Sequence, residues 1–298
     1  MRVILVHNPG AGDEDHSPAR LKEAIESAGH QVYRSMTPEE PLREELTGRV
    51  DLVVVAGGDG TVRVVFKHMA ERTTPVTVIP VGSANNIARA LRIDDEADVP
   101  RLVSAWERGE VKRYDLGICY CGPVEKTFVE STGAGIFAEM LLRAQEREEP
   151  AGQEKVRLGL QLLQEILKNA PVQPFGIEVD GRDVSADVLA VEVTNVPETG
   201  PRLSLDPQAD PADGLFDTVL VDAGSRGALL AYIDARLAGD PPKAPRFEVH
   251  RGSRIALSLP AGVPLRLDDE MVVEDPVGEG IRGVAVTPGA VVPVLVPA

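Results

Sequence analysis

The stretch VVVAGGDGTVRVV, residues 53–65, decides the fold. Small and β-branched apolar residues lead directly into Gly57-Gly58-Asp59-Gly60-Thr61, and a segment with helical periodicity follows at once. This order predicts a strand, a tight turn and a helix in an open parallel sheet, where ligands gather at the carboxyl ends of the strands. Glycine allows close backbone approach to a ligand, and a helix N-terminus presents free N–H groups to phosphate.

Asp59 would repel a bare phosphate, so its place inside this loop indicates an intervening cation. Mg²⁺ fits, because it takes oxygen ligands and bridges carboxylates to phosphates. The alternative is a glycine-rich turn in which Asp59 only caps the helix that begins near Thr61. The loop matches neither G-x-x-x-x-G-K-[ST] nor G-x-G-x-x-G, the commoner phosphate-binding patterns.

Two further loops support a ligand site at the strand ends. The segment VTVIPVGSANNIARAL, residues 76–91, repeats the order of strand, turn and helix through Gly82-Ser83. Asn8-Pro9-Gly10-Ala11-Gly12 follows the first apolar run in the same way. Ser83 could also cap its helix and do nothing more.

The first part of the chain, to about residue 121, alternates short apolar runs with helical patterns. The best-signalled helix spans about residues 17–28, because Ser17 can cap it, Pro18 lies in its first turn and Gly29 follows it. Strands that alternate with helices predict a parallel sheet covered on both faces.

The second part consists mainly of short strand candidates bounded by Gly, Pro or Asp, which predicts an antiparallel sandwich or barrel. One helix, residues 155–168, carries an apolar leucine and isoleucine stripe typical of core packing. The change of pattern near Gly122-Pro123 divides the chain into an α/β domain, residues 1–122, and a β domain, residues 123–298.

Composition excludes several classes of protein. Apolar residues make up 43% of the chain, which is typical of a globular protein. A net charge of −16 without a polybasic block argues against nucleic acid as a partner and against strong electrostatic attachment to anionic lipid. With no run long enough to span a bilayer and no signal peptide, we expect a cytoplasmic protein. Cys119 and Cys121 are expected to be free thiols.

Several motifs together resemble one known family. They are VVAGGDGT, the opening N-P-x-A-G, GSANNIARAL, LDPQADPADGLFDTVLV, RLDDE and the closing VTPGAVVPVLVP. In this order, over essentially the whole chain, they look like the diacylglycerol kinase catalytic-domain family of soluble bacterial lipid kinases. GGDGT alone is shared with NAD kinases and 6-phosphofructokinases, whereas its combination with ADGLFD and a late D-x-E is specific to this family.

The resemblance implies an N-terminal three-layer α/β domain with a parallel sheet, similar to NAD kinase and 6-phosphofructokinase, and a C-terminal antiparallel β-sandwich for the lipid substrate. It implies a nucleotide site in the cleft between them and transfer of the γ-phosphoryl group of Mg²⁺-ATP to a diacylglycerol-like lipid. The expected partners are ATP and a membrane-derived lipid alcohol, with at most transient contact with a membrane surface. A homodimer is left open.

The resemblance also assigns site residues. Glu270 matches the general base of the family's D-G-E motif, and Asp59 and Asp115 match its magnesium network. Asp210, Asp213 and Leu215 match an internal structural magnesium site, to which Asp213 gives its carboxylate and the other two give their carbonyls. The residues expected to border the nucleotide are Asn8, Thr37, Gly57, Gly58, Gly60, Thr61 and Ser83.

The chain departs from the family pattern near the expected metal. Val62-Arg63-Val64 replaces the x-N-E that usually follows GGDGT, and Asn86 replaces an aspartate of the magnesium network. Ser83 replaces threonine, Asp269 replaces the glycine of D-G-E, and Asp13 stands where a basic residue is common. These changes predict altered or weakened handling of magnesium.

Two alternatives to an active lipid kinase therefore stay open. One is a relative that binds lipid or nucleotide without catalysis, and the other is an enzyme similar to NAD kinase. The ADGLFD run, and the absence of an N-E motif after the GGDGT helix, argue against NAD kinase.

Overall fold

The computed structural model describes residues 1–10, 16–45, 50–93, 98–147, 150, 152–240, 242–273 and 282–298. The chain forms two compact units, the first made of Met1–Asp115 with Ala290–Ala298 and the second of Leu116–Gly289. The sequence places the boundary near residues 122 and 123 and leaves open whether the C-terminal tail returns to the first domain. In the structure the change of unit comes earlier, and the tail returns to the first unit.

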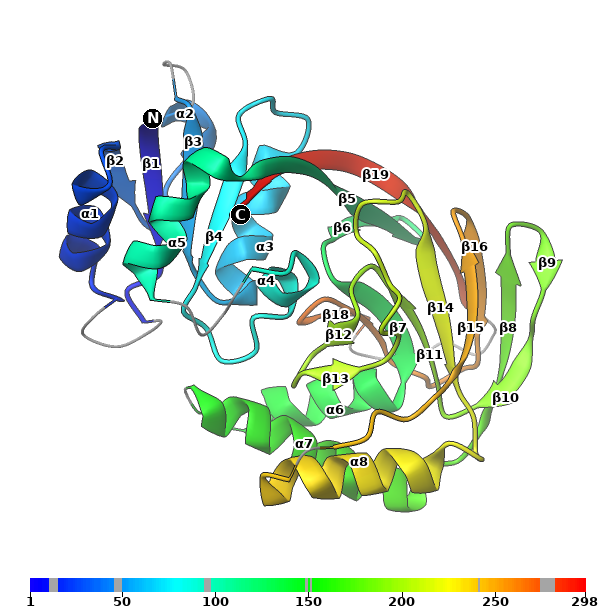
Figure 1. Ribbon diagram of the computed structural model, residues 1–298. Helices are drawn as coiled ribbons and strands as arrows, with labels where there is room; N and C mark the ends of the chain where they lie inside the picture. Colours follow the sequence, from blue (N-terminus) through cyan, green and yellow to red (C-terminus); the bar gives the residue numbers. More distant parts are fainter. Residues whose placement is uncertain are drawn as a thin grey trace. The chain divides into compact units, whose positions relative to one another are not determined.

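The first unit is built on a parallel sheet with the order β2-β1-β3-β4 (Figure 1). Its strands are β1 (Arg2–His7), β2 (Gln31–Met36), β3 (Leu52–Gly57) and β4 (Val76–Pro80). The end of β19 (Arg282–Val296) joins β4 in parallel through the pair Val294 and Val76. The helices are α1 (Pro18–Ser27), α2 (Leu42–Glu45), α3 (Asp59–Met69), α4 (Asn86–Ala90) and α5 (Val99–Ala105), with a short 3-10 helix at Trp106–Arg108.

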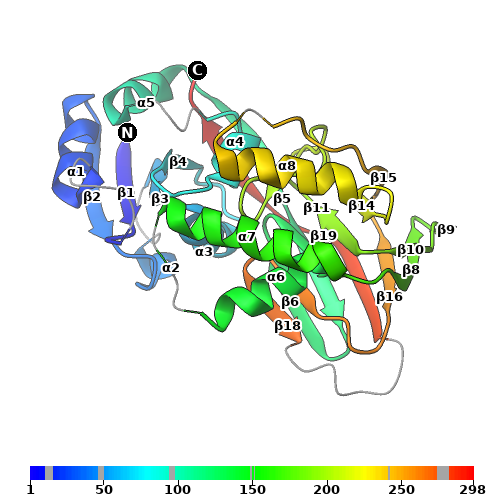
Figure 2. The same ribbon diagram turned by 90° about the horizontal axis from the view of Figure 1, so that it is seen from below.

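Helices cover both faces of this sheet (Figure 2). Because side chains alternate along a strand, Val3, Leu5 and Val54 share one face, where they pack in a core with residues of α1 and α5. Helix α3 packs against β3 and β4 through the buried side chains Val62, Val65, Phe66 and Met69. The predicted three-layer α/β architecture is confirmed. Ser17 takes the N-cap position of α1, although its side chain makes no capping hydrogen bond.

The second unit contains an antiparallel sandwich. One sheet has the order β15-β14-β11-β7-β17-β18. Its strands are β15 (Glu248–Gly252), β14 (Phe216–Val221), β11 (Ala190–Thr194), β7 (Ser131–Gly135), β17 (Leu265–Leu267) and β18 (Glu270–Val273). The facing strands are β5 (Glu110–Cys121), β6 (Val124–Phe128), β8 (Gln173–Val179), β9 (Arg182–Asp183), β10 (Ala186–Val188), β16 (Ile255–Leu259) and the start of β19. A short hairpin, β12 (Glu198–Thr199) with β13 (Leu203–Ser204), forms a separate two-stranded sheet.

Apolar residues of both sheets fill the space between them. The core includes Phe128, Phe175, Val191, Phe216 and Leu257. Cys119 and Cys121 belong to it as buried free thiols, as the sequence predicts. Burial raises the pKa of Cys119 to about 11, which keeps this thiol protonated and unreactive at neutral pH.

Helices cover the other face of the six-stranded sheet (Figure 2). The predicted helix at residues 155–168 is α7 (Gln153–Asn169). Two further helices that the sequence analysis did not identify, α6 (Ile136–Gln145) and α8 (Arg226–Ala238), pack on either side of α7. No helix among the described residues is both long enough and apolar enough to cross a membrane.

Candidate functional site

The carboxyl edge of the parallel sheet gathers the predicted nucleotide residues. Asn8 follows β1, Thr37 follows β2, Gly57 ends β3, and Gly82-Ser83 comes just after β4. The strand register aligns these ends, because His7 is paired with Ala56 and Gly57 with Pro80. Loops from four neighbouring strands therefore meet at one edge, as expected for a ligand site in an open α/β sheet.

The glycines of two loops touch each other through their backbones. A Cβ atom on Gly82 would lie 2.3 Å from the Cα atom of Gly58, and a Cβ on Gly58 would lie 3.0 Å from the Cα of Gly82. A Cβ on Gly57 would lie 2.6 Å from the Cβ of Thr61, a residue that is only 5% exposed. Packing within the protein is thus sufficient to explain why three of these positions carry no side chain.

Gly60 differs from the other three. A Cβ atom at this position would come no closer than 3.6 Å to any neighbour, and that neighbour is the end of the Arg63 side chain. Because the fold itself leaves room for a methyl group here, packing within the protein does not explain the small size of Gly60.

Asp59 joins the starts of two helices. It is the first residue of α3, and its Oδ1 accepts the backbone N–H of Ile87 in α4 at 3.0 Å. This bond satisfies one of the N–H groups that a helix leaves unpaired in its first turn. The carboxylate is therefore held at the carboxyl edge of the sheet, between the two glycine loops.

A second fixed turn follows β4. Gly82 donates its N–H to Oδ1 of Asn85 at 3.0 Å, and Nδ2 of Asn85 donates to the carbonyl of Gly82 at 2.9 Å. Asn85 is 4% exposed and has a left-handed backbone, with φ of 55°. The sequence analysis did not single out Asn85, although asparagine is among the residues that adopt this conformation most readily.

The loops that follow β1 and β2 are closed by local hydrogen bonds. Oδ1 of Asn8 accepts the N–H of Gly10 at 2.9 Å, and the N–H of Thr37 donates to Glu40 Oε1 at 2.8 Å. Asp13, noted in the sequence as a departure from the family, lies outside the described residues. The Asn8 side chain thus orders its own loop. Thr37 contacts Glu40 through its backbone N–H and not through its hydroxyl.

Asp115 is paired with an arginine two residues earlier. The side chain of Asp115 is 5% exposed, and its Oδ1 lies 2.5 Å from Nη2 and 2.9 Å from Nε of Arg113. Both residues lie in the part of β5 that belongs to the first unit. A guanidinium therefore already balances the charge of a carboxylate that the resemblance assigns to magnesium.

Glu270 lies in the second unit, at the start of β18. The connection from β17 is a hairpin in which Leu267 pairs with Glu270 and Asp268-Asp269 forms the turn. Oε2 of Glu270 accepts a hydrogen bond from Nζ of Lys126 on β6 at 2.8 Å, and the Glu270 side chain is 54% exposed. An exposed carboxylate held by an ammonium group can still receive a proton from a substrate hydroxyl.

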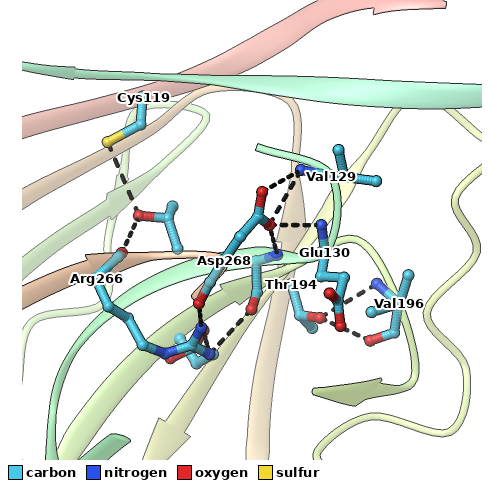
Figure 3. Close-up of polar contacts among 10 residues, drawn as sticks. Cys119, Val129, Glu130, Thr194, Val196, Arg266 and Asp268 are labelled. Carbon is cyan, nitrogen blue, oxygen red and sulfur yellow. Dashed lines mark hydrogen bonds and ion pairs between the residues drawn. The ribbon is translucent and has the colours of Figure 1, made fainter. Parts of the chain in front are cut away.

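Asp268 anchors this hairpin from inside the protein. Its Oδ1 accepts the N–H groups of Val129 at 3.1 Å and of Glu130 at 2.9 Å (Figure 3). Its own N–H donates to the carbonyl of Ser131 at 2.8 Å. Asp268 is 6% exposed and has φ of 53°. The turn before Glu270 is therefore fixed to residues 129–131.

The ADGLFD segment centres on Asp213, whose two oxygens are both engaged. Oδ1 accepts the N–H of Leu215 at 2.9 Å, and Oδ2 lies 2.7 Å from Nη2 of Arg251. Nε of Arg251 lies 3.2 Å from Oδ1 of the buried Asp217. The pKa of Asp217 is raised to about 6, and burial is the main cause. The nearby carboxylates of Asp206 and Asp213 also raise it, whereas the guanidinium of Arg251 lowers it. Asp210 uses its Oδ1 to accept the N–H of Ala212.

This arrangement does not fit the expected structural magnesium as it stands. The guanidinium of Arg251 supplies the positive charge that an ion bound to Asp213 would bring. The assignment of Asp210, Asp213 and Leu215 to magnesium stays a prediction.

The response of stability to Mg²⁺ separates these two accounts of Asp213. If Arg251 is the resident cation, neither EDTA nor added Mg²⁺ changes the melting temperature of the wild type in the absence of nucleotide. Arg251→Met then lowers stability by about 1–2 kcal/mol, between the values for exposed and buried ion pairs. Thermal melting of the wild type and of Arg251→Met, each with EDTA and with added MgCl₂, makes the measurement.

A wild type that loses several degrees of melting temperature in EDTA contradicts the role given to Arg251. In that case Asp213→Ala removes the effect of Mg²⁺, because the ion loses a carboxylate ligand.

Comparisons with known proteins agree with both halves of the structure. Residues 2–119 match the diacylglycerol kinase catalytic domain, and residues 131–295 match the YegS C-terminal NAD kinase beta sandwich-like domain. The diacylglycerol kinase of Bacillus subtilis is 24% identical over 284 residues, which cover 90% of this chain and 89% of that protein. A protein of Alcanivorax borkumensis named probable lipid kinase YegS-like is 24% identical over 286 residues, covering 91% and 90%.

Solved structures share the fold. The crystal structure of a diacylglycerol kinase from Bacillus anthracis has a TM-score of 0.70 at 18% identity and covers 100% of this chain and 97% of its own. Yeast NADH kinase, solved with NADH, has a TM-score of 0.57 at 11% identity and covers 100% and 83%. The predicted likeness to the NAD kinase fold is confirmed.

Proposed function

Because the chain belongs to the family of lipid kinases that join a diacylglycerol kinase catalytic domain to a YegS C-terminal NAD kinase beta sandwich-like domain, we propose that it transfers the γ-phosphoryl group of Mg²⁺-ATP to a hydroxyl of a diacylglycerol-like lipid. The observation that carries the proposal is that the chain has both parts such a transfer needs, a phosphate-binding edge and a carboxylate that can act as a base. The first unit has glycine loops and Asp59 at the carboxyl edge of its sheet, and the second has Glu270 on an anchored turn.

The first unit is proposed to bind the nucleotide phosphates. The open face at Gly60 and the first-turn N–H groups of α3 form the phosphate contact, supported by the turns at Asn8 and Ser83. Mg²⁺ arrives with ATP as part of the substrate and neutralises charge on the phosphates. Asp59 is the carboxylate of this edge that we assign to the incoming Mg²⁺-ATP, because its Oδ1 is already held in place by Ile87.

Glu270 is proposed to act as the general base. It accepts the proton of the lipid hydroxyl while the hydroxyl oxygen forms a bond to the γ-phosphorus, and the bond from that phosphorus to the β,γ-bridging oxygen breaks, so that ADP leaves. Lys126 holds one oxygen of this carboxylate. The sequence analysis missed Lys126, because its neighbour in space lies 144 residues away along the chain.

Incubation with Mg²⁺ and labelled ATP, across a panel of lipid alcohols, tests the proposal. The panel contains a diacylglycerol, a monoacylglycerol, a sphingoid base and phosphatidylglycerol, with NAD as a non-lipid acceptor. The proposal predicts one labelled lipid, with the diacylglycerol as the expected acceptor. Labelled NADP as the main product would instead favour the NAD kinase reading of the fold.

The remaining expectations belong to the same proposal. A lipid alcohol reaches the protein from a membrane, so the reaction needs transient contact with a membrane surface, and a cytoplasmic location stays a prediction.

Gly60→Ala is expected to weaken nucleotide binding without harming the fold. A methyl group here has room in the free protein, and alanine stabilises a helical position by about 0.5–1 kcal/mol relative to glycine. The melting temperature without nucleotide should therefore stay the same or rise. The increase in melting temperature that Mg²⁺-ATP gives the wild type should become smaller, because the methyl group obstructs the phosphates.

Gly58→Val and Gly82→Ala serve as the matched comparison. Both should also lose the stabilisation by Mg²⁺-ATP, but with a lower melting temperature in the free protein, since their side chains collide with the facing glycine loop. If Gly60→Ala keeps the full stabilisation by Mg²⁺-ATP, the phosphates do not bind at this loop.

A further inference from the structure

A buried ion pair spans the central strand of the six-stranded sheet. Arg266 of β17 and Glu192 of β11 lie on opposite sides of β7, and both are register partners of Gly133. They are 5% and 0% exposed. A Cβ atom on Gly133 would lie only 2.1 Å from Oε2 of Glu192, so this glycine leaves the room in which the two side chains meet.

The forked guanidinium of Arg266 donates hydrogen bonds to several acceptors. Nη1 donates to the carbonyl oxygen of Asp268 at 2.6 Å (Figure 3). Nη2 donates to Oγ of Ser131 at 3.0 Å and to Oε1 of Glu192. The bond to Asp268 closes the turn that begins two residues after Arg266. Together with the bonds from the Asp268 side chain to residues 129 and 130, it fixes both sides of this turn.

We propose that Arg266, with its charge balanced by Glu192, is a positioning residue for Glu270. Its guanidinium fixes the Asp268 carbonyl and hence the turn that sets where β18 begins. This inference rests on the proposed function, because it concerns the direction in which the general base faces its substrate.

Stability alone does not require this pair. Replacing a buried ion pair by apolar residues of similar volume is often neutral or stabilising, because burial of both charges is costly. What apolar residues cannot supply is the directional hydrogen bond from Nη1 of Arg266 to the Asp268 carbonyl. The arginine fork is also specific, because a lysine provides a single ammonium group in place of two linked donor nitrogens.

The test compares the double variant Arg266→Leu with Glu192→Leu, the single variant Arg266→Lys and the wild type. The assay uses Mg²⁺-ATP and dioctanoylglycerol in detergent micelles. We expect the double variant to fold with a melting temperature near that of the wild type. Its kcat should fall by about 10- to 100-fold, the effect of a misplaced catalytic group, while the KM for ATP stays unchanged.

Arg266→Lys keeps a positive charge opposite Glu192 but loses the fork. We expect it to fold and to show the same loss of kcat, so it also decides the question if the double variant does not fold. Arg236→Leu is the control, because Arg236 of α8 donates to the carbonyls of Pro201 and Arg202 and lies outside the proposed site. This control should lower the melting temperature and leave kcat unchanged.

Hydrogen exchange gives a readout that needs no activity. Amides of residues 127–132 and 265–272 should exchange faster in both Arg266 variants than in the wild type, with little change elsewhere. A folded Arg266 variant with wild-type kcat and wild-type exchange overturns the proposal. If the wild type phosphorylates no acceptor, the proposed function fails first, and unchanged exchange at residues 265–272 then shows separately that Arg266 does not order this turn.

Discussion

Glu270→Gln lowers the kcat for phosphoryl transfer to dioctanoylglycerol by about 10²- to 10⁴-fold, the range for loss of a general base. Glutamine keeps the shape of the side chain and an oxygen that can accept from Lys126, but it cannot take the proton of the lipid hydroxyl. The ion pair with Lys126 is half-exposed, so its loss should change stability by less than about 1 kcal/mol. The measurement is steady-state kinetics together with thermal melting in Mg²⁺-ATP.

The increase in melting temperature caused by Mg²⁺-ATP should stay the same in Glu270→Gln, since Glu270 belongs to the second unit and is not assigned to the nucleotide. Glu125→Gln on β6 is the matched control, because it makes the same change of charge at an exposed position one residue before Lys126. Wild-type kcat in Glu270→Gln would remove Glu270 from the mechanism.

Asp59→Asn should lower kcat/KM by about 10- to 100-fold, as expected when a carboxylate that supports a metal is neutralised. Asparagine keeps an oxygen that can accept the N–H of Ile87, so the contact between α3 and α4 survives and only the charge is lost. The effect should therefore fall on Mg²⁺-ATP binding as well as on turnover, unlike that of Glu270→Gln.

Calorimetric titration with ATP at several Mg²⁺ concentrations measures this prediction. Raising Mg²⁺ should partly restore ATP affinity in Asp59→Asn, because mass action compensates for weaker binding of the ion. If Asp59→Asn binds Mg²⁺-ATP as tightly as the wild type, Asp59 serves only to hold the start of α4 through Ile87.

The nucleotide edge could be predicted because its signals are local. In the stretch 53–65, one strand, one turn and one helix start follow each other without interruption, and the structure has β3 and α3 there. The predicted start of that helix at Thr61 is two residues late, because Asp59 already lies in the first turn of α3. Glycine packing could not be predicted, since Gly58 and Gly82 meet only once the strands are in register.

Helices α6 and α8 were missed although their signals are present. Residues 136–145 contain strong helix formers, and α8 ends at Gly239, which has φ of 80° as expected for a helix C-terminus. The surrounding sequence is dominated by strand candidates with period-two alternation, which masks the helical spacing of Leu229, Tyr232 and Ile233.

Contacts between residues far apart along the chain could not be predicted from the sequence. Glu192 and Arg266 are 74 residues apart, and they meet only because β7 lies between their strands with a glycine at the shared register position. The return of residues 290–298 to the first unit likewise depends on the pairing of β19 with β4. Such contacts follow from strand order, which local patterns do not specify.

The departures Arg63 and Asn86 bear on whether the chain is an active kinase. If the wild type transfers no phosphate, Arg63→Asn together with Asn86→Asp restores two of the family's residues near the proposed metal, and activity gained in this way would indicate a decayed kinase. Asn86 begins α4 and is 2% exposed, so Asn86→Asp introduces a buried charge. The variant must therefore be shown to fold before its activity is interpreted.

The most direct test of the central claim counts ATP consumed and lipid phosphate formed in one reaction. Wild-type protein, Mg²⁺-ATP, dioctanoylglycerol micelles and NAD are mixed, and ADP, lipid phosphate and NADP are measured together, beside a reaction without lipid. A lipid kinase forms one lipid phosphate for each ADP, makes no NADP and consumes almost no ATP without lipid. ADP that forms equally without lipid, or phosphate that appears on NAD and not on the lipid, would contradict the proposed function.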